Sequence, residues 1–481
     1  MQSAIPPLIV LALLSGCKTM GPDFQRPASA PNAAYASPSA AHGPAAVLGQ
    51  GPQAQWWQAF GSTDINALVE RALAGNQTLA ASRATLDRAR EQVRAANGRL
   101  QPQINASGQI NQQKVNLSGF GFDASAFGVN LGNPEFANYS VGAGISYDLD
   151  LFGAGKRSVE QASADAEAQR YETAAAHLAL SGRVVMQALM IAALNDRIAA
   201  QQVLIGEGER NVTLTERKRA GGTGTLVEVL SARQQLAADR AGLPQIEQHR
   251  TEARDLLAVL IGVTPGELGA TSLSLGALSL GALTLPQQVP VTLPSEMVHK
   301  RPDILASEAR LHAATAAIGV AQARLYPSVT LGASFTQLAR SPEKIFNGSS
   351  NSYSLLGGLS APLFHGGTLK AAKRGAEAEE RAAAARYRQA VLEAFGQVSD
   401  LLSALDNDAR SLALQNDAAD LAERSLDLSR RSFNAGNSGV LQVLDASRSV
   451  DRARIALVDA RARQFVNVAR LYVATAGGWT E

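Results

Sequence analysis

The chain has 481 residues and a formal net charge of +2, with one cysteine and 5% aromatic residues. This nearly neutral charge, without a block of basic residues, argues against nucleic acid as a partner. The single cysteine excludes an internal disulfide. Few aromatic residues and abundant alanine favour long helices with narrow seams over one large globular core.

The first residues resemble a bacterial lipoprotein signal. Residues 5–14 form an apolar run that is too short to span a bilayer, and Leu14-Ser15-Gly16-Cys17 follows at once. We expect residues 1–16 to be a signal peptide and Cys17 to become the lipidated N-terminus, although the segment before residue 6 lacks the usual Lys or Arg. Acyl chains on Cys17 would anchor the protein by about 0.8 kcal/mol per buried methylene. The alternative is an unmodified cysteine.

Residues 17–64 form the next segment, the lipid-anchored N-terminal part, within which residues 21–55 are rich in Pro, Ala, Ser and Gly. Such a composition predicts an extended chain lying over other structure, or a partly disordered linker. Beyond residues 5–14 we find no hydrophobic stretch that reaches the roughly 18 residues of a transmembrane helix. If the chain crosses a membrane, the sequence predicts that it does so with strands.

The rest of the chain contains two copies of the same sequence pattern, one after the other, which predicts that the fold has two similar halves. We assign residues 65–262 to the first repeat, 263–295 to a linker, 296–476 to the second repeat and 477–481 to a short end. Each repeat reads helix, strand, loop, strand, long helix, tip, helix. The matching segments are Arg99-Leu100-Gln101-Pro102 with Arg324-Leu325-Tyr326-Pro327, Leu151-Phe152-Gly153 with Leu363-Phe364-His365, and Leu226-Val227-Glu228-Val229-Leu230 with Val440-Leu441-Gln442-Val443-Leu444.

Each repeat contains two segments in which apolar and polar residues alternate. In one of them Val329, Leu331 and Phe335 fall on one face, whereas Thr330 and Ser334 fall on the other. This length and pattern suit tilted membrane-spanning strands, and the alternative is two amphipathic hairpins on a soluble domain. The predicted strands cover residues 103–112, 139–150, 327–338 and 352–363.

Four strands cannot close a barrel, and an open sheet edge in hydrocarbon would leave backbone groups unpaired. A membrane pore would therefore be shared between chains. Two chains would supply eight strands with a filled interior, and three would supply twelve with a lumen. The strand pattern by itself leaves both numbers open.

The predicted helices match one another in length. Helices over residues 156–218 and 369–434 would each be about 95 Å long, and those over 65–99 and 226–262 about half as long. Two shorter helices end to end would therefore equal one long helix. Heptad seams follow each tip. They run through Val229, Leu236, Leu243, Arg250 and Leu257, with Ala232, Asp239, Ile246, Ala253 and Leu260 as partners, and through Val443, Val450, Leu457, Gln464 and Leu471 in the second copy.

Together these features resemble TolC-type outer-membrane efflux ducts, most closely the NodT family of outer-membrane lipoproteins that serve resistance-nodulation-division (RND) pumps. The resemblance implies a mixed membrane α/β fold. In it, a trimeric twelve-stranded transmembrane β-barrel with four strands per chain continues into a periplasmic α-helical barrel of long, coiled-coil-like helices. A mixed equatorial belt would surround the helices, and residues 17–64 and the equatorial linker 263–295 would contribute to it. The matching motifs are the lipobox at Leu14–Cys17, Gly21-Pro22-Asp23-Phe24-Gln25-Arg26-Pro27, Arg301-Pro302-Asp303-Ile304 and Ala476-Gly477-Gly478-Trp479.

The implied function is the exit duct of a tripartite efflux system in the outer membrane of a Gram-negative bacterium. Such a duct passively passes small molecules, such as drugs, toxic compounds or metals, through a gated trimeric channel. The implied partners are two further copies of the chain, a periplasmic adaptor protein, an inner-membrane RND pump and outer-membrane lipid. The alternatives are the exit duct of a type I protein secretion system and a structural coiled-coil lipoprotein that spans the periplasm.

Two glycine-rich turns, residues 220–225 and 435–439, join a long helix to a shorter one and predict tight or left-handed backbone. Neither continues into the Lys-Ser or Lys-Thr of a phosphate-binding loop, so we do not expect nucleotide binding. The resemblance implies that these turns are the periplasmic tips that dock the adaptor. The residues assigned to docking are Gly221, Gly222, Gly224, Gly436 and Gly439.

The resemblance also implies a periplasmic gate formed by Leu441, Asp445 and Glu228. Leu441 and Asp445 are four residues apart and share a helix face, so three copies would form an apolar ring and a carboxylate ring. The carboxylate ring would favour cations and respond to pH and divalent ions. Glu228 would accept a bond from Arg430 or Arg431 of a neighbouring hairpin. The alternative for both acids is a first-turn residue favoured by the helix dipole.

An enzymatic function finds no support in the sequence. The six histidines share no metal-ligand spacing, and no Ser, Cys or paired-carboxylate motif with a plausible base is present. We therefore expect no catalytic activity, no metal site and no cofactor other than the covalent lipid on Cys17.

Overall fold

The structure is a computed structural model that describes residues 19–28, 43–116, 135–269 and 275–476. The signal peptide, Cys17 and the Gly477-Gly478-Trp479 end lie outside the described residues. The chain divides into two compact units, one of residues 1–26, 87–167 and 308–385, and one of residues 27–86, 168–307 and 386–481. Each unit takes equivalent segments from both repeats, so the units cut across the duplication.

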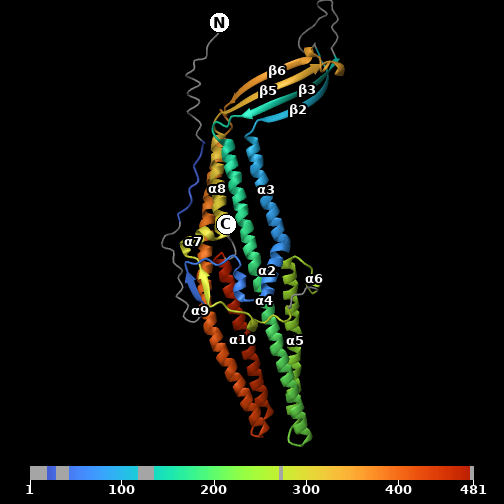
Figure 1. The fold of residues 1–481 in the computed structure, drawn as a ribbon, viewed down its shortest axis with the longest axis vertical. Coiled ribbons are helices and arrows are strands. Elements are labelled where there is room, and N and C mark those ends of the chain that lie inside the picture. Colours follow the sequence, from blue (N-terminus) through green and yellow to red (C-terminus); the bar gives the residue numbers. More distant parts are fainter. Residues whose placement is uncertain (1–18, 29–42, 117–134, 270–274, 477–481) are drawn as a thin grey trace, which may run out of the picture. The chain divides into compact units, whose positions relative to one another are not determined.

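The first unit contains a four-stranded antiparallel sheet (Figure 1). Its strands are β2 (Gln103–Lys114), β3 (Glu135–Asp148), β5 (Ser328–Ala339) and β6 (Asn351–Ser360), in that spatial order. The central pair, β3 and β5, joins the two repeats. The outer strands β2 and β6 leave two open edges, one from each repeat.

The register gives the sheet one apolar and one polar face. Ile104 lies opposite Ile145, which lies opposite Ala333, which lies opposite Leu355. One residue along, a row crosses the same strands through polar or small residues only: Asn105, Gly144, Ser334 and Ser354. The predicted alternation is therefore confirmed, and the four strands share it. Within the single chain the apolar face is uncovered, with Ile104 74% exposed.

Helices account for the remainder of both units. The two longest are α4 (Ala154–Ala220) and α9 (Thr368–Asn434), with 67 residues each, close to the predicted 156–218 and 369–434. A sharp turn at Asn76 separates α2 from α3, where the sequence predicted one helix over 65–99. The others are α2 (Thr63–Gly75), α3 (Gln77–Arg99), α5 (Leu226–Ile261), α6 (Pro265–Gly269), α7 (Pro294–Lys300), α8 (Pro302–Ala323) and α10 (Val440–Ala474).

The core of the second unit brings together segments that are far apart in sequence. Strand β1 (Ala45–Leu48) pairs in parallel with β4 (Gln288–Val291). The 3-10 helix Trp56–Phe60 places Trp56 against Tyr472 of α10, with ring centroids 5.4 Å apart, and Trp56 is 2% exposed. Segments from residues 17–64 and 263–295 thus pack with the end of α10 in one hydrophobic core.

The α4 helix corrects one sequence prediction. It contains an 18-residue window with a mean hydropathy of 1.5, so by length and composition it could cross a membrane. The prediction that no such stretch exists beyond residues 5–14 is therefore wrong. Most of the window, 67%, is buried inside the chain, where Val184, Val185 and Leu189 belong to the core. An amphipathic pattern is weak in this helix because it is covered on several sides.

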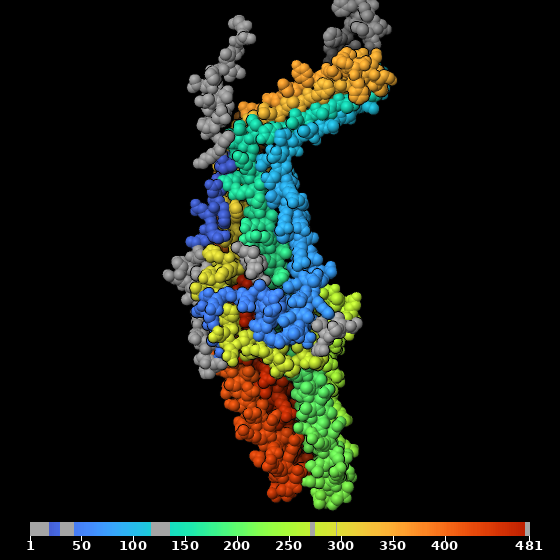
Figure 2. Space-filling model, viewed as in Figure 1, coloured from blue at the N-terminus to red at the C-terminus, as the bar shows by residue number. Residues whose placement is uncertain are grey.

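The heptad seams predicted after each tip are buried in part, since Leu243 and Arg250 of the first seam and Leu457 of the second are only half-buried. On α5 the buried residues include Val229, Leu236 and Leu257, and on α10 they include Val443 and Val450. The ends of the α4–α5 and α9–α10 hairpins lie side by side within the second unit, green and red in Figure 2. These hairpin ends carry the candidate site.

Candidate functional site

The first tip ends α4 with a hydrogen-bonded turn and begins α5 with a capping box. Thr223 N donates to Lys218 O at 2.9 Å, and Gly222 adopts a φ of +77°. Thr225 then caps α5: its Oγ1 accepts from Glu228 N, while its own backbone N donates to the Glu228 carboxylate at 2.7 Å. The turn satisfies the free carbonyls of α4 and the free amides of α5 locally.

The second tip repeats the turn without the side-chain cap. Asn437 N donates to Ser432 O at 2.9 Å, and Gly436 has a φ of +79°. Gly439 occupies the N-cap position of α10 and has no side chain to accept the first amides. Below this turn lies a small hydrophobic cluster made of Leu426, Phe433, Val440, Val443, Leu444, Ala446 and Val450.

Only some of the five glycines assigned to adaptor docking occupy positions where the backbone requires glycine. Gly222 and Gly436 need the left-handed region, where a side chain costs about 1–2 kcal/mol. A Cβ on Gly224 would lie 3.0 Å from Arg219 N, so space is tight there. A Cβ on Gly439 would meet nothing within 4 Å, and one on Gly221 would make ordinary contacts. The docking role given to these five glycines stays a prediction.

Two contacts tie the hairpins together near their ends. Lys218 of α4 places its Nζ 3.4 Å from the centre of the Phe433 ring of α9 and donates to the Phe433 carbonyl at 2.9 Å. Phe433 is itself only 4% exposed. Farther from the tip, Arg430 Nη2 of α9 pairs with Glu207 of α4 at 2.8 Å. The two hairpins are therefore linked by specific polar contacts as well as by packing.

Leu441 and Asp445 both lie on the exposed side of α10. Leu441 is 59% exposed, and the Asp445 side chain is 76% exposed. Because α10 begins at Val440, Asp445 falls in its second turn, and the first turn holds no acid. The first-turn interpretation of Asp445 is therefore wrong. Its carboxylate lies 3.4 Å from Arg448 Nη1, one turn farther along the same helix.

Glu228 has a different position from the one predicted. It is the third residue of α5, where its carboxylate caps the helix by bonding to Thr225. Arg430 pairs instead with Glu207, and Arg431 pairs with Asp427 on its own helix. Within the chain Arg430 and Arg431 pair with these other acids, so a bond from either arginine to Glu228 of a neighbouring hairpin stays a prediction. The first-turn alternative describes Glu228 correctly.

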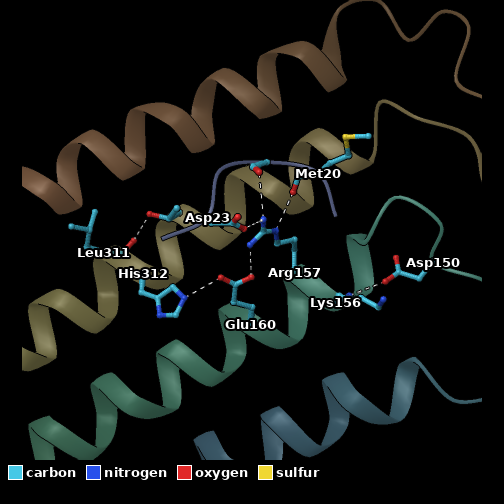
Figure 3. Close-up of polar contacts among 10 residues, drawn as sticks. Met20, Asp23, Asp150, Lys156, Arg157, Glu160, Leu311 and His312 are labelled. Carbon is cyan, nitrogen blue, oxygen red and sulfur yellow. Dashed lines mark hydrogen bonds and ion pairs between the residues drawn. The ribbon is translucent and has the colours of Figure 1, made fainter. Parts of the chain in front are cut away.

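A second polar cluster holds the segment that follows Cys17 (Figure 3). Arg157, 5% exposed in its side chain, lies near the start of α4. Its guanidinium donates to Asp23 at 2.6 Å, to the Met20 carbonyl at 3.0 Å and to Glu160 at 2.6 Å. Burial lowers the pKa of Arg157, but these acids outweigh it and the net shift is upward. The cluster therefore keeps a permanent charge buried and fully paired.

Further contacts fix the same segment along α8. The Phe24 ring stacks on His312 with centroids 4.5 Å apart, and His312 Nε2 lies 3.0 Å from Glu160. Arg26 pairs with Glu308 at 2.6 Å. Sequence reasoning found Asp23, Phe24 and Arg26 as a motif but missed Arg157. The sequence contained one indication of this contact: Asp23, the acidic residue of the motif, needed a basic partner in another part of the chain.

The backbones approach closely at the same place. A Cβ on Gly21 would lie 2.4 Å from Gly319 Cα, so the segment touches the α8 backbone directly. A Cβ on Gly153 would lie 2.6 Å from Thr19 Cγ2, and Met20 N donates to Phe152 O at 3.1 Å. The described residues 19–26 thus form an extended strap on α4 and α8, as the composition predicted for this segment.

The described residues contain no group of three or more His, Cys, Asp and Glu side chains arranged to hold a metal ion. The tips carry the exposed Leu441 side chain and the contacts between the hairpins, and the strap is a separate feature held on α4 and α8.

Comparisons with known proteins agree with this arrangement. Residues 68–263 and 293–477 match the family described as "Outer membrane efflux protein". The chain is 32% identical over 473 residues to the pyoverdine export outer membrane protein OpmQ of Pseudomonas aeruginosa, covering 98% of this chain and 97% of OpmQ. It is 30% identical to the outer membrane protein OprJ of the same species, covering 98% and 95%. The solved outer-membrane channel OprN superposes with a TM-score of 0.86 at 27% identity, covering 96% of this chain and 100% of that one.

Proposed function

This chain belongs to the outer membrane efflux protein family, and from that premise we propose that three copies form the gated exit duct of a tripartite RND-type efflux system. The protein is an efflux protein of the Gram-negative outer membrane, as its relatives are. The matched family consists of channels, not enzymes. The proposed cargo is small molecules; OpmQ is named for pyoverdine export.

The sheet is the observation that carries the proposal. It has an apolar face and a polar face, and its edges β2 and β6 are open. Unpaired edges cannot face hydrocarbon, because each unsatisfied backbone group costs several kcal/mol. Pairing β2 of one copy with β6 of the next satisfies both edges. Three copies give twelve strands, enough to leave a lumen.

The long helices support the same assembly. Leu414, Leu421 and Leu428 repeat every seven residues on α9 and are all exposed in the single chain. A heptad stripe of leucine is the sequence signature of a helix that packs against another helix. We propose that a second copy covers this stripe and continues the helical wall.

The strap supports a lipid anchor at Cys17. Thr19 is held against Gly153 in the turn between β3 and α4, beside the end of the sheet. Two residues span at most about 7 Å, so a lipid on Cys17 would start close to the ends of the strands. The proposed anchor would then enter the membrane leaflet nearest these strand ends.

The proposed gate consists of Leu441 and Asp445 on α10, and the proposed adaptor contacts are the two tips. Both gate residues are exposed in one chain and can meet their copies on a threefold axis. The structure gives Glu228 a capping role at the first tip, so the proposed gate is limited to Leu441 and Asp445.

The test is single-channel conductance of the purified full-length protein in planar bilayers, with its oligomeric state measured by mass photometry. We expect a trimer with small, mostly closed, cation-selective events, and a conductance several-fold larger for the double variant Leu441→Ala with Asp445→Ala. Glu228→Gln is the matched control at the other tip and should leave conductance unchanged. A monomer without conductance would instead favour the structural coiled-coil lipoprotein.

A further inference from the structure

Arg448 of α10 donates to Gln235 of α5 at 2.6 Å, and about one turn farther along each of these two helices lies an aspartate. Asp239 lies on α5 and Asp451 on α10; both are partly buried, and the charge of Asp239 acts on Asp451. Asp451 Oδ1 is buried and has no hydrogen-bond partner within the described residues. An unsatisfied buried oxygen costs about 1–3 kcal/mol, and more when it is charged. A proton on this carboxyl group removes the charge and provides a donor.

The groups around the pair come from each neighbouring helix. Arg448, Arg452 and Arg454 of α10 are the nearby cations, and Arg454 is already paired with Glu423 of α9 at 2.9 Å. From α4, Gln201 Nε2 donates to the Asp239 carbonyl at 2.6 Å, and Gly208 lies beside Asp239 Oδ2. Burial outweighs the arginines, so the pKa of each carboxyl is raised above its ordinary value of 3.8, and Asp239 raises that of Asp451 further.

A chain of polar contacts leads from this pair to the gate. Gln235 Nε2 donates to Asp239 Oδ1 at 2.7 Å, which leaves its amide oxygen free to accept. That oxygen accepts from Arg448 Nε at 2.6 Å, and Arg448 Nη1 reaches the Asp445 carboxylate at 3.4 Å. Asp239 therefore orients the amide that holds Arg448, and Arg448 positions Asp445.

We propose that Asp239 and Asp451 share one proton, and that loss of this proton loosens α10 from α5 and frees the gate carboxylate Asp445 through Gln235 and Arg448. The proposal rests on the proposed function as a gated duct and names the regulation of that gate. With one proton present, the pair has a single negative charge and the hairpins stay together. With none, two like charges repel at a partly buried contact, where charges interact more strongly than in water.

The direction of the pH dependence follows from the raised pKa. A group whose pKa is higher in the closed contact binds its proton more tightly there, so protonation favours the closed contact. Closure is therefore strongest at acid pH and weakens as the pH rises through the pKa of the pair. The window begins above the ordinary aspartate value of 3.8. Arg448 acts as a positioning residue that transmits the change.

The experiment compares wild type with Asp451→Asn in planar bilayers, because the amide keeps the shape and cannot ionise. We expect the wild-type open probability to rise about tenfold per unit of pKa shift as pH increases, and the variant to stay mostly closed and flat. Asp417→Asn, an exposed position on α9, is the matched control and should keep the wild-type profile. Parallel profiles for wild type and Asp451→Asn would overturn the proposal.

Thermal unfolding of the same purified trimer gives a readout that does not need conduction. We expect Asp451→Asn to raise Tm by about 2 °C at neutral pH and by nothing at acid pH. Adding Asp239→Asn should bring no further gain, since the repulsion is already gone. A variant Tm that shows no pH-dependent gain would refute the shared proton, even if no form of the protein conducts and the proposed duct fails.

Arg448→Gln separates the pair from its transmission to the gate. Without the guanidinium, the gate should lose its pH response, while the pH dependence of Tm that arises from Asp239 and Asp451 persists. Arg448→Lys, which can still reach one partner, should restore part of the response. If Arg448→Gln leaves the gating profile unchanged, Arg448 does not transmit it.

Discussion

The two tips have the same backbone turn but are stabilised in different ways. Gly222 and Gly436 occupy equivalent left-handed positions, and each turn closes with the same type of hydrogen bond. The first tip then relies on the Thr225 and Glu228 capping box, whereas the second has Gly439 at the cap and relies on the packing of Phe433. The duplication thus preserved the backbone turn, while the side chains around it diverged.

The two tips also differ in the contacts that hold them, and the proposed gate residues lie at only one of them. The first tip is secured within its own hairpin, by bonds between neighbouring residues. The second tip, which carries Leu441 and Asp445, is secured by the hydrophobic cluster within its own hairpin and by a contact with the first hairpin, Lys218 on the Phe433 ring. Contacts between elements can be broken when the elements move, whereas a capping box moves with its helix. On this ground we predict that the second hairpin is the one that moves on opening.

Among the substitutions that test this difference between the tips, removal of the Phe433 ring should have the largest effect on local stability. Phe433→Ala deletes a buried ring from the second-tip cluster and the cation–π contact with Lys218, so we expect about 3 kcal/mol of local destabilisation. Hydrogen exchange of peptides around residues 426–450 measures it, with faster exchange at the second tip. Arg219→Ala, the equivalent position in the first copy, is the control. Equal acceleration at both tips would contradict the proposed difference.

The shared turn should be sensitive at both tips to the same extent. Gly222→Ala and Gly436→Ala each force a side chain into the left-handed region, and each should cost about 1–2 kcal/mol. Gly439→Ala is the matched control, because its φ is negative and its Cβ would meet nothing within 4 Å. The measurement is again local hydrogen exchange. An effect of Gly439→Ala as large as that of Gly436→Ala would show that the turn geometry is not the cause.

Loss of the cap should affect the first tip only. Thr225→Ala removes the side-chain acceptor for the first amides of α5 and should cost about 1 kcal/mol. Thr225→Ser keeps the hydroxyl and should retain most of the protection in hydrogen exchange at residues 226–229. If Thr225→Ala and Thr225→Ser exchange alike, the capping box does not secure this tip.

The smallest expected effect is a gain at the second tip. Gly439→Ser with Gln442→Glu installs the capping box of the first copy at the start of α10, which should add about 0.5 kcal/mol. The same variant should lower the open probability in planar bilayers if mobility of this tip contributes to opening. Slower exchange at residues 440–443 without any change in gating would separate local stability from gate motion.

Several predictions from the sequence hold because they depend on local periodicity. The alternation at Val329, Leu331 and Phe335 places these residues on one face of β5, and the register extends that face across the other strands. The seam through Val229 and Val443 is buried, because heptad spacing specifies one stripe of a helix. The tips fall where glycine permits left-handed backbone.

Other features depend on what a residue meets in the fold. Arg157 has no repeat partner or motif in the sequence, yet it is the buried centre of the strap contacts. Glu228 could have faced an arginine of the other hairpin, but Thr225 lies closer. The sequence pattern did not reveal the apolar window of α4, because alanine and scattered polar residues interrupt the apolar run of this helix, which is covered on several sides.

By itself, the sequence determined the duplication, the strands with their two faces, the lengths of the helices and the resemblance to efflux ducts. These follow from periods of two, 3.5 and 3.6 residues and from glycine at turns, which act over a few residues. Only the tertiary structure decided which charged groups meet, including Arg157 with Asp23 and Arg430 with Glu207. Such contacts join positions more than a hundred residues apart, and burial sets their strength, so no local pattern specifies them.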